Sequence, residues 1–386
     1  MNKVLLILPT WNAGLFFHHG LQYVSATMAR QGIEHDIIML DEPDCLPVML
    51  ELLDNDYDTV AATSTSCEFE KLNNLIGELK EFENDDKTYL LGGAHATITN
   101  DKGNFTDICV GEYGGYADNL DDLPDYLDGK MPLQEILDAK KGWLSVIVSR
   151  GCPYRCAYCV NSLNPQSVRR MSVEKAIQHI SSIVRSLKGV KYINLDDDNL
   201  ATDKFWLGEF LNMYKVAINI PYVINIRAVD LTDEVANLLQ DTGCHEVQIG
   251  VECGNETTRR IILNKKISNE TLCRAFDNCN RRGIRSLAYI MHGLPFTNGA
   301  SVIETANLIK RLKPTLVRDT YLYPFEGTAI RNTCIKAGCQ ISGYNDNYYD
   351  VSCFTGEDSE KQRFRRELEG HYKVCERNNN YLEKKA

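Results

Sequence analysis

The chain contains 386 residues, of which 44% are hydrophobic, and its 42 Lys and Arg against 53 Asp and Glu give a net charge of −11. This length favours two or three domains with a large buried core. The negative charge argues against a broad nucleic-acid interface, which needs surplus cations, and leaves room for local basic patches such as Arg281, Arg282 and Arg285. No apolar run approaches the roughly 20 residues of a membrane span, so we expect no membrane partner. Fourteen cysteines without a recognisable signal peptide indicate a reduced, cytoplasmic protein.

The first hundred residues alternate between short apolar runs and helical stripes. Strand-like runs cover residues 4–8, 36–40, 59–63 and 88–91, and helical periodicity covers residues 21–28, 46–53 and 72–82. This order predicts a doubly wound, Rossmann-like parallel sheet in an α/β domain of residues 1–112. Such a sheet binds ligands at the carboxyl ends of its strands, here the loops at residues 9–19, 64–67 and 92–97.

Residues 113–142 are acidic and rich in turn-forming residues. Pro124, Gly129 and Pro132 stand among several aspartates in this segment. We expect it to be a linker without a site of its own.

The second predicted domain, residues 143–330, alternates strands and helices again. Its six strand-like runs lie at residues 144–148, 190–195, 222–226, 246–250, 286–291 and 316–323. Polar residues and glycines directly follow these runs. Because functional groups gather at the carboxyl ends of the strands in a (β/α) barrel, we expect the active site there.

The remaining residues, 331–386, form a charged tail that we expect to contact substrate as a lid. Phe364, Leu368, Tyr372 and Cys375 suggest one amphipathic helix in it. The tail cysteines have irregular spacings and do not indicate a second metal cluster. These cysteines are Cys334, Cys339, Cys353 and Cys375.

Three cysteines follow the first strand of the second domain, in the segment Cys152-Pro-Tyr-Arg-Cys156-Ala-Tyr-Cys159. This spacing lets three thiolates bind three corners of one 4Fe–4S cube and leaves the fourth iron open and reactive. Zinc would need four nitrogen or sulfur ligands, usually in C-x2-C pairs, and no fourth candidate lies nearby in the sequence. A zinc site and three unrelated buried cysteines are the alternative interpretations.

This segment, with Tyr158 directly before the last cysteine, resembles the cluster loop of the radical SAM superfamily. The resemblance implies a partial (β/α)6 barrel whose open iron binds the amino and carboxylate groups of S-adenosylmethionine (SAM). It also implies SAM contacts from strand ends, through the Asp196–Asn199 run, the Gly-x-Glu-x-Gly motif and two glycine turns. The implied contacts are Tyr158, Asp197, Asp198, Arg227, Glu252, Gly293 and Thr328. An aspartate here could instead cap the next helix, and Arg227 could instead form a surface ion pair.

The Gly92-Gly93-Ala94-His95-Ala96-Thr97 turn and Val110-Gly111-Glu112 resemble the cobalamin-binding domain that precedes many radical SAM domains. The resemblance implies cobalamin contacts from Ser64, Cys67, Gly92, Gly93, His95, Ala96, Thr97 and Glu112. The Asp-x-His-x-x-Gly motif that supplies histidine to cobalt in other cobalamin proteins is absent, so we expect no histidine on the cobalt. His95 as a hydrogen-bonded turn residue and Cys67 as a buried small hydrophobe are the alternatives.

Together the resemblances imply a cobalamin-dependent radical SAM enzyme, most often a C-methyltransferase, with a 4Fe–4S cluster, SAM and cobalamin as cofactors. A 5′-deoxyadenosyl radical would abstract hydrogen from an unactivated carbon, which methylcobalamin then methylates. Rearrangement, cyclisation or ring contraction is one alternative, and a non-catalytic iron–sulfur or zinc regulatory protein is another. We expect a small-molecule substrate and an external electron donor of the flavodoxin or ferredoxin type. Tyr23, Tyr289 and Tyr323 are candidate proton or radical relays, although most tyrosines are simply packed.

Overall fold

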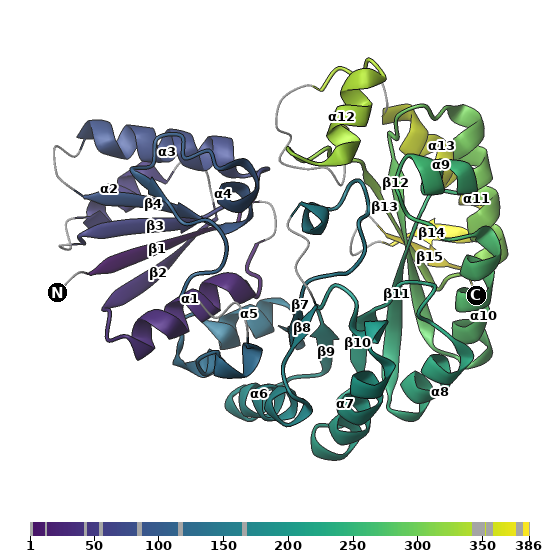
Figure 1. Cartoon of the computed structure of the whole chain (residues 1–386), viewed down its shortest axis with the longest axis horizontal. Coiled ribbons are helices and arrows are strands. Elements are labelled where there is room, and N and C mark those ends of the chain that lie inside the picture. The colour runs from purple at the N-terminus through teal and green to yellow at the C-terminus, as the bar shows by residue number, and fades with distance from the viewer. Residues whose placement is uncertain are drawn as a thin grey trace. The chain divides into compact units, whose positions relative to one another are not determined.

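The computed structural model describes residues 3–11, 14–41, 45–53, 57–82, 87–114, 119–163, 168–341, 352, 358–375 and 381–385. The chain divides into two compact units (Figure 1). Unit 1 consists of Met1–Leu144 and Arg169–Val190, and unit 2 consists of Ser145–Val168 and Lys191–Ala386. None of the described helices is long and apolar enough to cross a membrane.

The described part of unit 1 contains a five-stranded parallel sheet in the order β2-β1-β3-β4-β5. Its strands are β1 (Val4–Pro9), β2 (His35–Leu40), β3 (Thr59–Thr63), β4 (Thr88–Gly92) and β5 (Asp107–Ile108). This confirms the predicted doubly wound, Rossmann-like class. The strand order reverses between β1 and β3, and a sheet of this kind binds ligands outside the carboxyl ends of its strands at that point.

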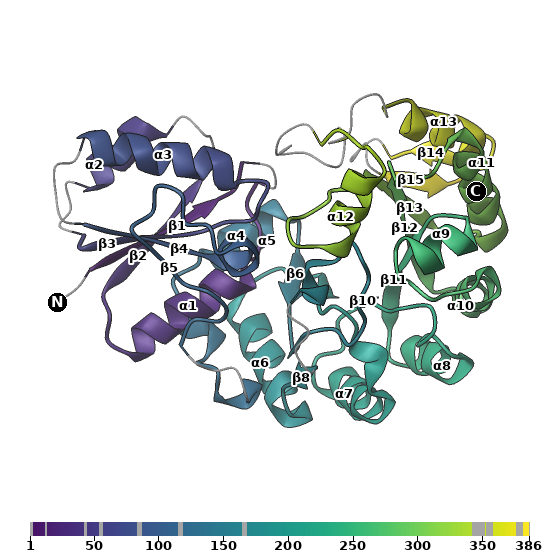
Figure 2. The same ribbon diagram turned by 45° about the horizontal axis from the view of Figure 1, so that its top comes forward.

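Both faces of this sheet are covered by helices. Figures 1 and 2 show α2 (Leu46–Leu53) and α3 (Phe69–Phe82) on one face and α1 (His19–Arg30) on the other. The stripe of α3 that the periodicity predicted packs into a core with β1, β3 and β4, and Leu72, Ile76 and Leu79 are fully buried there. The packing of the apolar face of α3 against these strands therefore fixes the position of the sheet edge at which they end.

Residues 93–97, which we predicted to be a turn, instead begin helix α4 (Gly93–Thr99). Gly93 has φ +88°, so the chain turns from β4 into the helix without an intervening loop. After Gly93 the sequence contains no helix breaker before Asn100, which ends the helix in a left-handed conformation.

The acidic segment after β5 packs within unit 1. It contains the short 3-10 helices η1 (Leu120–Asp122) and η2 (Tyr126–Asp128) and helix α5 (Leu133–Ala139). Tyr126 is buried between Tyr23 and His179, and His179 lies on helix α6 (Val173–Ser186). The described part of this segment is therefore held to unit 1 by the packing of Tyr126 against Tyr23 and His179.

Unit 2 contains an eight-stranded sheet in the order β14-β15-β13-β12-β11-β10-β9-β6 among the described residues. The predicted strands are β6 (Trp143–Val146), β9 (Tyr192–Leu195), β10 (Tyr222–Asn225), β11 (Cys244–Glu252), β12 (Arg285–His292) and β13 (Leu316–Tyr321). Strands β9 to β13 are parallel. This confirms the predicted partial barrel.

Helices follow the strands of the barrel in the chain. They are α7 (Lys204–Ala217), α8 (Asp233–Asp241), α9 (Glu256–Ile261), α10 (Asn269–Arg281), α11 (Gly299–Leu312) and α12 (Ala329–Lys336), with the short helix η4 (Leu200–Thr202) before α7. Figure 2 shows α7, α8, α10 and α11 along the outer side of the curved sheet.

The tail contains the predicted helix as α13 (Asp358–Leu368), with Phe364 and Leu368 buried. Tyr372 and Cys375 lie beyond it, so their assignment to the helix was wrong; Gly370 follows the last turn. The chain continues as β14 (Tyr372–Val374) and β15 (Tyr381–Lys384), and β15 pairs antiparallel with β13. Cys353 lies outside the described residues.

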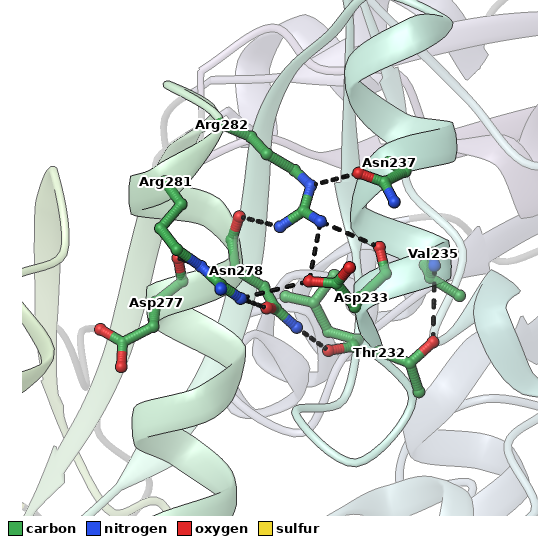
Figure 3. Close-up of polar contacts among 9 residues, drawn as sticks. Thr232, Asp233, Val235, Asn237, Asp277, Asn278, Arg281 and Arg282 are labelled. Carbon is green, nitrogen blue, oxygen red and sulfur yellow. Dashed lines mark hydrogen bonds and ion pairs between the residues drawn. The ribbon is translucent and has the colours of Figure 1, made fainter.

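The predicted basic patch is an ion-pair network. Figure 3 shows Arg281, the last residue of α10, and Arg282, which follows it, reaching Asp233 at the start of α8, with nitrogen–oxygen distances of 3.2 and 2.8 Å. Arg285 lies 3.6 Å from Glu246. Asp233 therefore pairs with two arginines and ties the start of α8 to the end of α10, and Glu246 lies against the third arginine.

Candidate functional site

The three cysteines of the predicted cluster loop meet at one cavity in unit 2. Cys152, Cys156 and Cys159 follow the short strand β7 (Ser149–Arg150), and the short helix η3 (Val160–Ser162) begins directly after them. All three are free thiols, and all three line a cavity of about 370 Å³. The thiols are therefore neither bridged to one another nor scattered.

Backbone hydrogen bonds hold this loop from two sides. Ala157 N donates to Leu263 O at 2.8 Å, and Ile330 N at the start of α12 donates to Ala157 O at 3.0 Å. Leu263, Leu294 and Ile330 are buried in one apolar cluster with Ala157. The middle of the loop is thus fixed by residues more than 100 positions away in the sequence.

The donor set at the cavity fits a cluster with three protein ligands. Burial raises the pKa of the Cys152 thiol and raises that of Cys159 to about 11, and the neighbouring cysteines add to both shifts. Bound iron would supply the positive charge that thiolates at such positions need. No three His, Cys, Asp or Glu side chains in the described ranges converge closely enough to hold one metal ion. Three unbridged thiols on one loop suit a 4Fe–4S cube with one open iron.

Asp197 fixes the root of the cysteine loop. It is 2% exposed and accepts hydrogen bonds from Ser149 N at 2.5 Å, Ser149 Oγ at 2.6 Å and Val148 N at 3.1 Å. Burial raises its pKa to about 7, and these hydrogen bonds oppose the rise. Asp198 also lines the cavity, and its carboxylate accepts from Asn161 Nδ2 at 2.7 Å.

Neither aspartate caps the next helix, which was the alternative interpretation. Asn199 stands at the start of η4, and the Asp203 carboxylate caps α7 by accepting from the backbone of residues 205 and 206. Asp197 and Asp198 are therefore free to serve the cavity and its loop.

Glu252 stands beside the cavity in an unusual backbone conformation. Its φ is +69°, and the register of β11 against β12 shifts between Gly250 and Glu252. The carboxylate accepts from Lys265 Nζ at 2.6 Å and from Tyr158 OH at 2.7 Å. A Cβ on Gly250 would collide with both Glu252 Oε1 and Lys265 Nζ, so a larger residue there would have to displace this ion pair.

Lys265 is a site residue that the sequence did not reveal. It lines the cavity, its side chain is 8% exposed, and it forms a buried ion pair with Glu252. Lys265 follows Asn264 in an irregular segment, so no helical or strand periodicity indicates that its side chain faces the cavity. The one hint in the sequence is that Lys265 lies between the apolar residues Leu263 and Ile267, which suggests burial. A buried lysine is rare unless it has a charged partner, so burial would have pointed to a partner such as Glu252.

Among the described residues, Arg227 does not form the surface ion pair that was its alternative. It is partly buried at the cavity wall, and Nη1 donates to Cys156 Sγ at 3.2 Å. The guanidinium carbon lies 3.9 Å from the centre of the Tyr154 ring. The charge therefore acts directly on a thiol of the loop.

The other predicted residues of unit 2 lie farther from the thiols or serve the fold. Tyr289 lines the cavity and donates to Gln248 Oε1 at 2.5 Å. Gly293 N donates to Glu360 Oε2 at 3.0 Å, and Thr328 Oγ1 donates to Phe325 O at 2.5 Å. Gly293, Thr328 and Tyr323 are not among the described residues that line this cavity, and Tyr323 packs on the Phe325 ring at 4.6 Å.

Tyr23, the third candidate relay, is in unit 1. It is buried in an aromatic group, with its hydroxyl 3.4 Å from His179 Nε2. Its ring also lies edge-on to Tyr126. These contacts are those of a packed tyrosine in the core of unit 1.

The predicted cobalamin residues gather at the carboxyl ends of β3 and β4 in unit 1. His95 N donates to Ser64 O at 3.0 Å, and a Cβ on Gly93 would lie 2.9 Å from Ser64 N. His95 is 1% exposed, stacks on Phe69 with ring centres 3.7 Å apart, and lies 3.1 Å from Ser66 Oγ. His95 is therefore a packed residue at this edge of the sheet. It lies in helix α4, and not in a turn as the alternative interpretation had it.

The remaining predicted cobalamin residues have ordinary structural contacts. Thr97 Oγ1 accepts from Gly111 N at 3.1 Å, and Cys67 and Ala96 are buried. Glu112 binds Arg169, also of unit 1, through both carboxylate oxygens at 2.6 and 3.2 Å. Gly92 ends β4 and precedes the helix.

Comparison with known proteins agrees with this geometry. Residues 146–309 match the model of the radical SAM superfamily. An uncharacterised methyltransferase of Pyrococcus horikoshii is 25% identical over 55% of this chain and 46% of its own length. A bacteriochlorophyllide d C-8(2)-methyltransferase of Chlorobaculum tepidum is 23% identical over 74% of this chain and 70% of its own length. The chain thus spans less than half of the Pyrococcus relative.

A solved structure shares the fold of the whole chain. The radical S-adenosylmethionine methyltransferase TsrM of Kitasatospora setae, with cobalamin and a [4Fe-4S] cluster bound, has a TM-score of 0.70 and 14% identity. The similarity covers 100% of this chain and 88% of TsrM. At this identity the likeness is one of architecture.

Proposed function

Because residues 146–309 belong to the radical SAM superfamily, we propose that this chain is a cobalamin-dependent radical SAM enzyme that methylates an unactivated carbon of its substrate. The observation that carries the proposal is the meeting of three free thiols at one cavity with the polar ends of the barrel strands. The names of the two methyltransferase relatives and the cofactors bound to TsrM support the choice of chemistry.

The residues of unit 2 divide the work around the cysteine loop. When bound, the cluster supplies the electron that cleaves SAM to a 5′-deoxyadenosyl radical, and cobalamin supplies the methyl group. Cys152, Cys156 and Cys159 would hold three irons of the cluster. Asp197 keeps the root of the loop in place through three hydrogen bonds, so the loop would present its thiols to a cluster from a fixed backbone.

The ion pair of Glu252 and Lys265 places an oriented carboxylate beside the cavity, where it could contact SAM. Lys265 and Tyr158 hold the Glu252 carboxylate in one orientation, from which it can accept hydrogen bonds from the amino group or ribose of SAM. Because the pair is buried, the carboxylate needs little reorganisation when SAM binds. We further propose that the turns at Gly293 and Thr328 lie toward the adenosyl group.

We propose that cobalamin binds at the carboxyl edge of the unit 1 sheet. The crossover point between β1 and β3 lies at this edge, and Gly93 turns the chain from β4 directly into α4 there. Its contacts would come from the predicted set at residues 64–67, 92–97 and 112. We propose a small-molecule substrate and an external donor of the flavodoxin or ferredoxin type.

The decisive experiment measures iron and SAM cleavage in anaerobically reconstituted protein. The wild type should bind about four irons per chain and should release 5′-deoxyadenosine from SAM with dithionite as reductant. The triple variant C152A/C156A/C159A should lose both, and Cys273→Ala, which removes a thiol of α10 outside the cavity, should lose neither. Cleavage retained in the triple variant would remove the mechanism, and iron without cleavage would favour a regulatory protein.

A second experiment tests cobalamin and the methyl transfer. Protein produced with hydroxocobalamin supplied should show corrin absorption bands in addition to the broad iron–sulfur absorption. Absence of these bands would reduce unit 1 to a scaffold. A methylated product would support methyl transfer, whereas 5′-deoxyadenosine with an unmethylated, rearranged or cyclised product would favour the alternative radical outcome.

A further inference from the structure

The guanidinium of Arg227 contacts the cysteine loop at a sulfur atom. Nη1 lies 3.2 Å from Cys156 Sγ, and Cys156 is the most buried of the three thiols. Within the described part of the chain, none of the contacts that Arg227 makes is an ion pair with a carboxylate. The positive charge of Arg227 is thus left to act on the sulfur and the cavity beside it.

A short network holds Arg227 in this position. Its guanidinium stacks on the Tyr154 ring at 3.9 Å, a distance typical of a cation–π contact. The Tyr154 hydroxyl donates to the Asp230 carboxylate at 3.1 and 3.3 Å, and Asn199 Nδ2 donates to the same carboxylate at 2.8 Å. Asp230 N also donates to Arg227 O at 2.9 Å and closes the turn that carries both residues.

Arg227 also has a hydrogen-bond donor that the described residues do not satisfy. Its Nε is buried and has no partner among the described residues. A buried donor of this kind is normally satisfied, so an acceptor in the cavity would complete it. Sulfur atoms of a bound cluster are such acceptors, and they become more negative when the cluster is reduced.

We propose that Arg227 sets the reduction potential of the cluster at this loop and that Tyr154 is its positioning residue. Net charge near a cluster and hydrogen bonds to its sulfurs are two of the factors that fix its potential. A cation that donates to Cys156 Sγ stabilises the one-electron-reduced cluster more than the oxidised one, so it raises the potential. This inference rests on the proposed function, because it requires the cluster to bind.

The test is an anaerobic redox titration of the reconstituted protein without SAM, followed by EPR of the reduced cluster. Arg227→Met should lower the ratio of reduced to oxidised cluster at a fixed potential about tenfold, which for one electron is about 59 mV. Tyr154→Leu should shift it in the same direction by less, and Arg227→Lys, which keeps the charge, should recover part of the loss. Arg155→Met is the matched control, since Arg155 lies in the same loop but is exposed.

The outcomes separate this inference from two other readings. If Arg227→Met leaves the SAM-free potential equal to that of Arg155→Met but weakens SAM binding, Arg227 holds the SAM carboxylate and the inference is wrong. If the wild type binds no iron, the proposed function fails first. An unchanged potential in both Arg227 and Tyr154 variants that still contain four irons overturns the inference alone.

Discussion

The buried ion pair between Lys265 and Glu252 offers the sharpest test of the site geometry. The two side chains are each 8% exposed, and Nζ lies 2.6 Å from Oε1. At an effective dielectric constant of about 20, two unit charges at this distance attract with about 6 kcal/mol. Much of this attraction offsets the cost of removing both charges from water. Losing one partner leaves that cost uncompensated.

Lys265→Met should therefore lower the local stability of unit 2 by about 3–5 kcal/mol. Glu252→Gln should cost less, because the amide oxygen can still accept from both Lys265 Nζ and Tyr158 OH, whereas methionine at position 265 leaves the carboxylate without its cation. The double variant should cost at least about 2 kcal/mol less than the sum of the two single variants, since the contact residues form one unit.

Hydrogen exchange of peptides from β11 and β12, read by mass spectrometry, measures this local free energy without assuming that both units unfold together. Lys310→Met is the control, because the Lys310–Glu367 pair is 3.8 Å long with side chains 29% and 38% exposed. Its loss should cost less than about 1 kcal/mol. If Lys265→Met costs no more than this control, the pair is not buried in solution and the site geometry is wrong.

Three other buried features give testable changes in stability. Gly93→Ala should destabilise unit 1 by about 3 kcal/mol or more, because φ is +88° and the new Cβ would lie 2.9 Å from a backbone nitrogen; Gly32→Ala, with φ +72° and open space, should cost only about 1 kcal/mol. Burial lowers the pKa of His179 to about 4, so the folded state binds fewer protons than the unfolded chain below pH 6.5. Stability should fall by about 2 kcal/mol from pH 7 to pH 5 in exchange measurements on α6, and His179→Gln should flatten this fall. Arg365→Met leaves Asp319, which is 0% exposed, without its bidentate partner at 2.9 Å and should release α13 to faster exchange by about 3–5 kcal/mol; unchanged α13 protection would contradict this.

The sequence was most informative where a local pattern has one physical meaning. The α3 stripe of Leu72, Ile76 and Leu79 has the helical period and is fully buried. The six barrel runs are strands because each is a short apolar segment bounded by polar or glycine residues. Sequence failed where local propensity was balanced, as in residues 93–97, whose alanines and histidine suit a helix as well as a turn once Gly93 has turned the chain.

Much of the candidate site was beyond any local pattern. Lys265 lies 107 positions from Tyr158, and the two meet because the segment after α9 is hydrogen-bonded to the cysteine loop through Leu263 O and Ala157 N. Asp197, which we predicted to contact SAM, accepts hydrogen bonds from the backbone of residues 148 and 149 in the structure, and this role cannot be read from an Asp-Asp-Asp run. Tyr154 gains importance only through the stacking of Arg227 on its ring.

The spacing of Cys152, Cys156 and Cys159 was sufficient on its own to suggest an open cluster, because three thiols within eight residues can reach one cube whatever surrounds them. The alternation of strands and helices likewise fixed two α/β units. Only the tertiary structure decided which charges lie against that loop. Residues that are distant in the chain become neighbours when strand ends converge on one edge, and buried charges are tolerated only where such neighbours compensate them.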